Sequence, residues 1–257
     1  MSTARLGASA LVATMIAVPA LAAPPPPPPD GAWFGAGQGG LLFSSGNTKA
    51  TAFNAKLDLA RIDGPWKNLL DFGGLYAKNN GIVSSERIDG RYELDHKVTD
   101  RLFWFAGLDA VRDIFSGFAY QATLAGGLGY KFIDEADTKL SGTLGAGYQR
   151  LETQQLIRDA SGAVVQRIDG SARGSAVGTA GLSLEQKLTT STKLTDKLFV
   201  TSGSLNTSVT NDLAVAVSMS DALALSLGYG IRYNTTPAPG VKKLDQLTTI
   251  NVVYSIK

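Results

Sequence analysis

From residue 33 onward the chain places apolar residues at every second position, and never in a run long enough for a membrane-spanning helix. Leu223, Leu225, Leu227 and Tyr229, for example, alternate with small or polar residues. A period of two is typical of a β-strand with one apolar face, whereas a spanning helix needs about 20 consecutive apolar residues. In residues 87–97 the second face carries charged side chains. The pattern therefore predicts an all-β protein whose strands have one apolar face and one polar face.

The prolines and glycines agree with this prediction. Seven of the ten prolines precede residue 30, and only Pro65 interrupts residues 30–236. Proline cannot donate a hydrogen bond to a sheet, so a long proline-free region favours continuous strands. Glycines recur within the expected strands, as in Gly126-Gly127 and at Gly142, Gly145 and Gly147. Glycine weakens an ordinary strand, but it allows the close approach and bending that a curved barrel needs.

The first 32 residues differ from the rest. Residues 1–22 carry one early basic residue, Arg5, then an apolar stretch, Pro19 and the Ala20-Leu21-Ala22 sequence. This order is typical of a cleaved secretory signal peptide, and the apolar stretch is short for a membrane anchor. Residues 23–32 contain six consecutive prolines and are predicted to form a stiff polyproline leader. We therefore divide the chain into a signal peptide (1–22), a proline-rich leader (23–32) and a β-barrel domain (33–257).

Alternation and turn residues together predict twelve strands in the barrel domain. An even number suits a bacterial outer-membrane barrel with both termini on the periplasmic side. Such barrels have short periplasmic turns and longer external loops, and residues 151–171 and 235–243 are predicted to be the long loops, with the tight turn at 45–47 as the exception. Residues 192–202 fit least well, because Asp196 shares a phase with Leu194 and Leu198. The predicted strands are 33–45, 49–61, 67–78, 85–98, 102–112, 119–133, 138–150, 172–188, 192–202, 207–219, 222–234 and 244–256.

Two architectures fit an exported protein made of alternating strands. A soluble barrel or sandwich of the lipocalin kind would turn its apolar face inward, and a transmembrane up-and-down antiparallel β-barrel would turn it outward. Twelve strands with consistently polar second faces offer more apolar surface than one closed core can use. Aromatic residues also cluster near both predicted strand ends, with Trp104 and Tyr130 at one end and Tyr76 and Tyr148 at the other. Such girdles are expected at the two membrane interfaces, so the transmembrane barrel is the preferred architecture.

Composition removes several classes of function. The chain has 24 Lys and Arg against 22 Asp and Glu, a formal net charge of +2, and therefore lacks the basic excess typical of nucleic-acid binding. It has no Cys and one His, His96, which leaves no thiol nucleophile and no zinc site of the usual Cys and His ligands. His96 shares the apolar phase of Tyr92 and Leu94, which indicates an interfacial side chain. We predict no enzyme activity, no catalytic residue, no cofactor and no metal site.

The inward face is the candidate functional surface. Opposite the apolar phase we predict ten basic and ten acidic side chains that point into the lumen. Balanced charge favours ion-pair ladders over a strongly selective pore. Twelve strands should enclose a lumen intermediate in width between one that side chains fill and one that leaves a wide channel. The principal lumen-lining candidates are Lys56, Asp58, Asp89, Arg91, Glu93, Asp95, Lys97, Asp109, Asp113, Lys131 and Arg232. The remaining members of the set are Asp71, Lys139, Arg173, Glu185, Lys187, Lys193, Lys197, Asp212 and Asp245.

Several short segments, in their order and spacing, resemble a known family. They are Ser44-Ser45-Gly46-Asn47-Thr48, Ala77-Lys78-Asn79-Asn80-Gly81, Asp113-Ile114-Phe115-Ser116-Gly117, Gly126-Gly127-Leu128-Gly129-Tyr130 and Pro239-Gly240-Val241-Lys242-Lys243-Leu244-Asp245. Over residues 35–256 the chain resembles the salt-induced outer membrane protein family of YdiY type, a domain of unknown function. The resemblance implies a Gram-negative outer-membrane barrel and supplies no catalytic residues. The chain ends in Lys257, whereas such barrels often end in an aromatic residue recognised by the assembly machinery.

These observations predict a protein of the bacterial outer membrane with a structural or envelope-stress role, namely a salt response, and a narrow, charge-laddered lumen. The alternative is a narrow, porin-like passive channel for ions or small solutes. Under either interpretation the expected partners of the protein are outer-membrane lipid and, during biogenesis, the barrel-assembly and periplasmic chaperone machinery. No nucleic-acid partner is expected.

Overall fold

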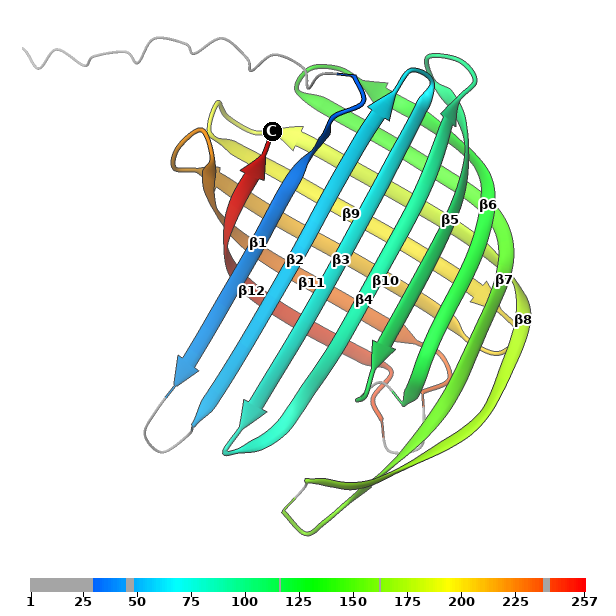
Figure 1. Cartoon of the computed structure of the whole chain (residues 1–257), viewed down its shortest axis with the longest axis vertical. Helices are drawn as coiled ribbons and strands as arrows, with labels where there is room; N and C mark the ends of the chain where they lie inside the picture. The colour runs from blue at the N-terminus through cyan, green and yellow to red at the C-terminus, as the bar shows by residue number, and fades with distance from the viewer. Residues whose placement is uncertain (1–29, 45–48, 116, 162, 238–240) are drawn as a thin grey trace, which may run out of the picture.

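The structure is a computed structural model that describes residues 30–44, 49–115, 117–161, 163–237 and 241–257. They form one closed antiparallel barrel in which each strand pairs with its sequence neighbours and β12 pairs with β1 (Figure 1). The predicted fold class, a barrel of twelve up-and-down strands, is confirmed. The strands are β1 (Trp33–Ser44), β2 (Ala50–Asp63), β3 (Trp66–Asn79), β4 (Ile82–Lys97), β5 (Leu102–Asp113), β6 (Phe118–Asp134), β7 (Thr138–Arg158), β8 (Val164–Lys187), β9 (Thr192–Gly203), β10 (Thr207–Ser218), β11 (Leu223–Asn234) and β12 (Leu244–Ile256).

Three segments of the sequence interpretation fall outside this description. The predicted signal peptide and residues 23–29 of the proline-rich leader precede the described residues, which begin at Asp30, and the tight turn predicted at 45–47 lies in the undescribed segment 45–48. The described residues contain no helix that is both long and apolar enough to cross a membrane.

The outer wall of the barrel is apolar and the inner wall is polar. Leu144 and Ile250 expose 72% and 66% of their surface on the outside, whereas Gln149 and Thr179 on the inward phase each expose 3%. A soluble barrel would show the opposite distribution. An apolar exterior around a polar interior is the arrangement of transmembrane barrels, because lipid contacts one wall and water or polar side chains contact the other. The lipocalin-like alternative therefore does not fit the structure.

The two ends of the barrel differ. One end carries the first residues of β1, the C-terminus and the short turns at 64–65, 98–101, 135–137, 188–191 and 219–222 (Figure 1). At the other end a long hairpin of β7 and β8 extends past its neighbours (Figure 1). We call these the short-turn end and the hairpin end.

The long external loop predicted at 151–171 is wrong. Strands β7 and β8 continue through this region and are joined only by residues 159–163. Register shifts at Glu152/Gln154 and Ile157/Arg158 interrupt the strict alternation, and polar residues such as Gln155 and Arg167 occupy both faces. A hairpin that projects from the barrel needs no apolar face, so hydrophobic periodicity does not reveal it. At the same end, Asn80 and Gly81 both adopt positive φ and form the two-residue turn of a tight hairpin.

Asp196 explains the irregular pattern of β9. Its register partners are Leu184 on β8 and Leu213 on β10, both on the apolar outer phase, so its carboxylate lies on the outer wall. Asn211 Nδ2 donates a hydrogen bond of 2.6 Å to Asp196 Oδ1. A charged side chain among leucines is costly on a lipid-facing wall, and this hydrogen bond offsets part of that cost. The strand predicted at 192–202 is therefore present, with one polar residue on its apolar face.

Candidate functional site

The polar lumen is the candidate functional site, and the predicted lumen residues lie at three levels within it. Lys56, Asp58, Asp89, Arg91, Asp109, Asp113 and Arg232 lie on inward phases in the middle and towards the hairpin end. Glu93 and Asp95 are buried closer to the short-turn end, with exposures of 8% and 7%. Lys97 and Lys131 lie at the short-turn rim, where they pair with Asp100 and Asp134 in the adjoining turns.

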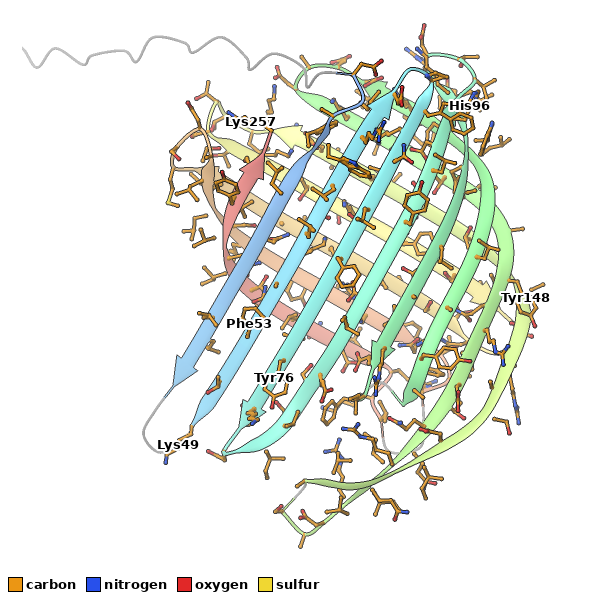
Figure 2. The ribbon with its side chains drawn as sticks, viewed as in Figure 1. Lys49, Phe53, Tyr76, His96, Tyr148 and Lys257 are labelled. Atoms are coloured by element: carbon orange, nitrogen blue, oxygen red, sulfur yellow. The ribbon has the colours of Figure 1, made fainter. Side chains whose placement is uncertain are left out.

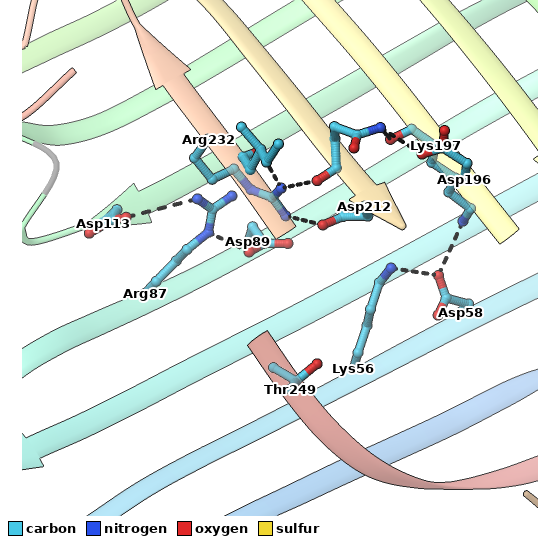
Figure 3. A network of polar contacts seen from close by, with 12 residues as sticks. Lys56, Asp58, Arg87, Asp89, Asp113, Asp196, Lys197, Asp212, Arg232 and Thr249 are labelled. Atoms are coloured by element: carbon cyan, nitrogen blue, oxygen red, sulfur yellow. Dashed lines mark hydrogen bonds and ion pairs between the residues drawn. The ribbon is translucent and has the colours of Figure 1, made fainter. Parts of the chain in front are cut away.

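A lysine on one wall of the barrel reaches the opposite wall. Lys197 Nζ on β9 lies 3.4 Å from Asp58 Oδ1 on β2 (Figure 3). The same Nζ lies 3.6 Å from Asp71 Oδ1 on β3. Four strands separate β9 from β2 around the shorter side of the barrel, so these ion pairs cross the lumen. Lys56 Nζ also lies 3.4 Å from Asp58 Oδ1. Because Asp58 and Asp71 are direct partners in the register of β2 and β3, the two lysines offset the repulsion between two facing carboxylates.

A second contact crosses the lumen beside the first. The guanidinium carbon of Arg91 on β4 lies 4.3 Å from the ring centroid of Phe199 on β9, which is cation–π geometry. Arg91 also forms an ion pair with Glu93 on its own strand. Phe199 shares the inward phase of Lys197, so two side chains of β9 contact the facing wall of β2, β3 and β4. We call Lys197, Phe199, Asp58, Asp71 and Arg91 the lumen bridge.

Ion pairs line the wall on the hairpin side of the lumen bridge. Arg87 Nε lies 2.8 Å from Asp89 Oδ1, and Arg87 Nη1 lies 3.8 Å from Asp113 Oδ2 on the neighbouring strand (Figure 3). Arg232 Nη2 lies 2.7 Å from Asp212 Oδ1. All of these groups except Asp113 border a cavity of about 160 Å³, which Lys197 and Phe199 also line. The cavity holds both signs of charge, as balanced ladders predict.

Two aromatic side chains, Phe103 and Phe105, pack inside the lumen on the short-turn side. Phe105 exposes only 4% of its surface although it points into the barrel. A Cβ at Gly145 would lie 2.9 Å from the Phe105 ring, and one at Gly129 would lie 2.1 Å from the ring of Phe103. Glycine at these two wall positions therefore makes room for the two rings. Glu93 and Asp95 are also buried on this side of the lumen bridge, with exposures of 8% and 7%.

Four contributors to this site are missing from the predicted lumen set: Arg87, Phe199 and the two phenylalanines of β5, Phe103 and Phe105. Arg87 belongs to the charged face of 87–97, so its alternation with Ile88 was a usable signal. Phe199 stands in the phase of Lys193 and Lys197, opposite Leu198 and Val200. Only the outward Asp196 obscures that phase.

His96 lies outside the lumen, in an aromatic cluster at the short-turn end. Its ring centroid is 4.4 Å from that of Trp66 and 5.4 Å from that of Trp104 (Figure 2 marks His96). The three residues are register partners on β3, β4 and β5. This placement is that of an interfacial girdle side chain. In the part of the chain that the structure describes, no group of three or more His, Cys, Asp or Glu side chains is arranged to hold a metal ion.

Comparison with known proteins gives one family and several distant folds. Residues 38–256 match the family described as "Protein of unknown function, DUF481". No curated protein is significantly similar to the chain.

Solved structures resemble the chain only at low identity. The COG4313 outer membrane channel from Pseudomonas putida F1 is 11% identical with a TM-score of 0.47, and the match covers 90% of this chain and 96% of that one. The β-domain of the Bordetella autotransporter BrkA is 13% identical with a TM-score of 0.41, covering 89% and 100%. The Pseudomonas putida toluene transporter TodX is 14% identical with a TM-score of 0.37, covering 89% of each chain. Structural similarity at this level gives no information about function. Function is therefore inferred from the residues of the lumen.

Proposed function

The chain belongs to the DUF481 family of proteins of unknown function, and from its own barrel we propose a structural, envelope-stress role in the bacterial outer membrane, with a lumen that side chains hold closed. The observation that carries this proposal is the reach of Lys197 across the lumen to Asp58 and Asp71. A water-filled pore needs a continuous path, and a side chain bonded to both walls interrupts it.

Four further features support a closed lumen. The cation–π contact of Arg91 with Phe199 lies beside the lysine, and Phe105 is buried inside the barrel on the short-turn side of it. The ion pairs of Arg87 and Arg232 join side chains that would otherwise interact with passing ions. A selective pore usually carries a ring of charges of one sign, whereas basic and acidic groups alternate in this lumen. The lumen therefore resembles a stiffening core more than a conduit.

The outer-membrane location rests on the apolar outer wall and on the export signal predicted at residues 1–22. Cell fractionation tests it, because the mature protein should be recovered with the outer membrane and should begin near Ala23. The folded barrel should migrate differently before and after heating in detergent gels. Recovery of the mature protein in the soluble periplasm would contradict the membrane location.

The salt-response role rests on the resemblance to the salt-induced family and on the ion pairs of the lumen. Salt screens partly hydrated charge pairs, so a lumen held by ion pairs is a component whose stability depends on the ionic strength it meets. A strain that lacks the gene should grow normally in low salt and poorly in high salt. The wild-type gene should restore growth in high salt. If the Lys197→Met variant restores growth to the same degree, the salt-response role does not depend on the lumen bridge.

The second candidate is a narrow passive channel for ions or small solutes. It is favoured by the cavity of about 160 Å³ on the hairpin side of the lumen bridge. The bridge itself consists of side-chain contacts, which can break without any change in the backbone. The two candidates differ in one observable, the ionic current through the wild-type barrel.

A further inference from the structure

The outer wall of the barrel carries a groove that neither the lumen nor the proposed role uses. It has a volume of about 400 Å³ and lies over β2 to β5, in the half of the barrel near the hairpin end. Figure 2 labels two of its residues, Phe53 on β2 and Tyr76 on β3, which are register partners. Pockets of about 300–1,000 Å³ are the usual size for small-ligand sites. A depression of this size on a lipid-facing wall is large enough to hold part of a lipid.

One glycine, Gly74, lies in the groove between large apolar residues. Gly74 on β3 pairs with Ala55 on β2 and with Ile88 on β4. A Cβ at Gly74 would meet no atom within 4 Å, so the space above this glycine is open. Phe53 and Ile88 border it with 47% and 50% of their surfaces exposed. Such a wall suits an apolar chain.

Basic residues lie at the edge of the groove. Arg112 on β5 is the register partner of Ile88, lies one residue before the end of its strand and is exposed. Lys78 lies near the end of β3 with its Nζ 5.5 Å from the Tyr76 ring centroid. Glu86 also lines the groove, and among the described residues no ion pair joins it to Arg112. The guanidinium therefore keeps its donors for a ligand, and Arg binds phosphate through paired N–H groups.

We propose that this groove is a binding site for one phosphate-bearing lipid, with an acyl chain over Gly74 between Phe53 and Ile88 and the phosphate at Arg112. The apolar groove and Arg112, which forms no ion pair with another described residue, are adjacent in the way that the acyl chain and headgroup of such a lipid are adjacent. The inference requires that the outer wall faces lipid, and it is independent of whether the lumen conducts.

Glycine substitutions test the groove with a matched control. Gly74→Leu should fill the open space without displacing neighbours, because a Cβ there meets nothing within 4 Å. Gly178 on the outer phase of β8 has the same open surroundings and lies outside the groove, so Gly178→Leu is the control. Full-length protein in detergent would be titrated with phosphatidylglycerol and the bound lipids counted by native mass spectrometry. We expect Gly74→Leu to weaken binding of the first lipid about tenfold or more and Gly178→Leu to leave it unchanged.

A headgroup comparison tests the role of Arg112. Wild-type protein should prefer phosphatidylglycerol to diacylglycerol with the same acyl chains by about tenfold, the equivalent of one charge-assisted contact. Arg112→Gln, at an exposed position, should remove that preference, whereas Arg150→Gln on β7 should retain it. Millimolar inorganic phosphate should not displace the lipid. Equal binding by the Gly74→Leu and wild-type proteins, a preference that survives Arg112→Gln, or displacement by free phosphate would each overturn the proposal.

Discussion

Replacing Lys197 with methionine should destabilise the barrel, because it removes the cation that joins two walls. At 3.4 and 3.6 Å, its contacts with Asp58 and Asp71 are each worth about 1 kcal/mol in bulk water and about 5 kcal/mol at an effective dielectric constant near 20. The Lys197 side chain is 50% exposed, so the lower value applies. Two contacts then give a loss of about 2 kcal/mol. Methionine keeps most of the side-chain volume, so packing changes little.

Reversible urea unfolding in lipid vesicles, followed by tryptophan fluorescence, measures this loss. Asp71→Asn removes one of the two facing carboxylates, so Lys197→Met should cost about half as much in that background. Lys193→Met is the matched control, because Lys193 on the same strand pairs at 2.9 Å with Glu185 at the exposed rim and should contribute less than about 1 kcal/mol. An equal cost of Lys197→Met with and without Asp71, or no cost at all, would refute the cross-lumen pairing.

Three other predictions concern the wall and its rim. Leu227→Arg on the outer wall should lower the free energy of unfolding in vesicles by about 2–4 kcal/mol, whereas Leu247→Arg on the lumen phase of β12 should lower it far less. Equal losses for the two variants would contradict the assigned faces. The double variant Asp196→Leu, Asn211→Val should raise the free energy of unfolding by about 1 kcal/mol, because it removes a polar pair from the lipid-facing wall. A loss of stability would show that this pair has another partner. The hydrogen bond and charge of Lys97 lower the pKa of Asp100 below its ordinary 3.8, so stabilisation by this carboxylate is complete above about pH 4 and is lost as the pH falls through the lowered value. Lys97→Gln should return the pKa of Asp100 towards 3.8 in an NMR titration, and an unchanged value would rule out Lys97 as the cause.

The strands and their two faces were predictable because alternation reports directly on lipid and lumen. Residues 223–229 illustrate this, since Leu223, Leu225, Leu227 and Tyr229 are exposed on the outer wall as their phase predicts. The signal is missing where strands leave the barrel wall. In the projecting part of the hairpin of β7 and β8, from residue 155 to residue 171, exposed side chains lie on both faces of the strands, so no apolar periodicity marks them. Residues 151–171 were therefore wrongly predicted to be a loop.

The lumen was predictable in composition but not in contacts. The phase of Lys197 placed it inside the barrel, yet nothing in the sequence shows that β9 faces β2 and β3. That relation depends on how twelve strands close, through β12 pairing with β1, and on how much space Phe105 leaves inside. Phe199 shows the same limit, because an aromatic residue on a polar face is explained only by Arg91 on the opposite wall.

The central claim is that the lumen of the wild-type barrel is closed, and ionic current across a planar bilayer tests it most directly. Purified wild-type protein, shown to be inserted, should leave the current at background. A variant with alanine at Lys197, Arg91 and Phe105 removes the lumen bridge and the aromatic filling, and it should produce discrete conductance steps as the positive control. Reproducible steps from the wild-type protein, in proportion to the number of inserted barrels, would contradict the closed lumen and establish the narrow channel.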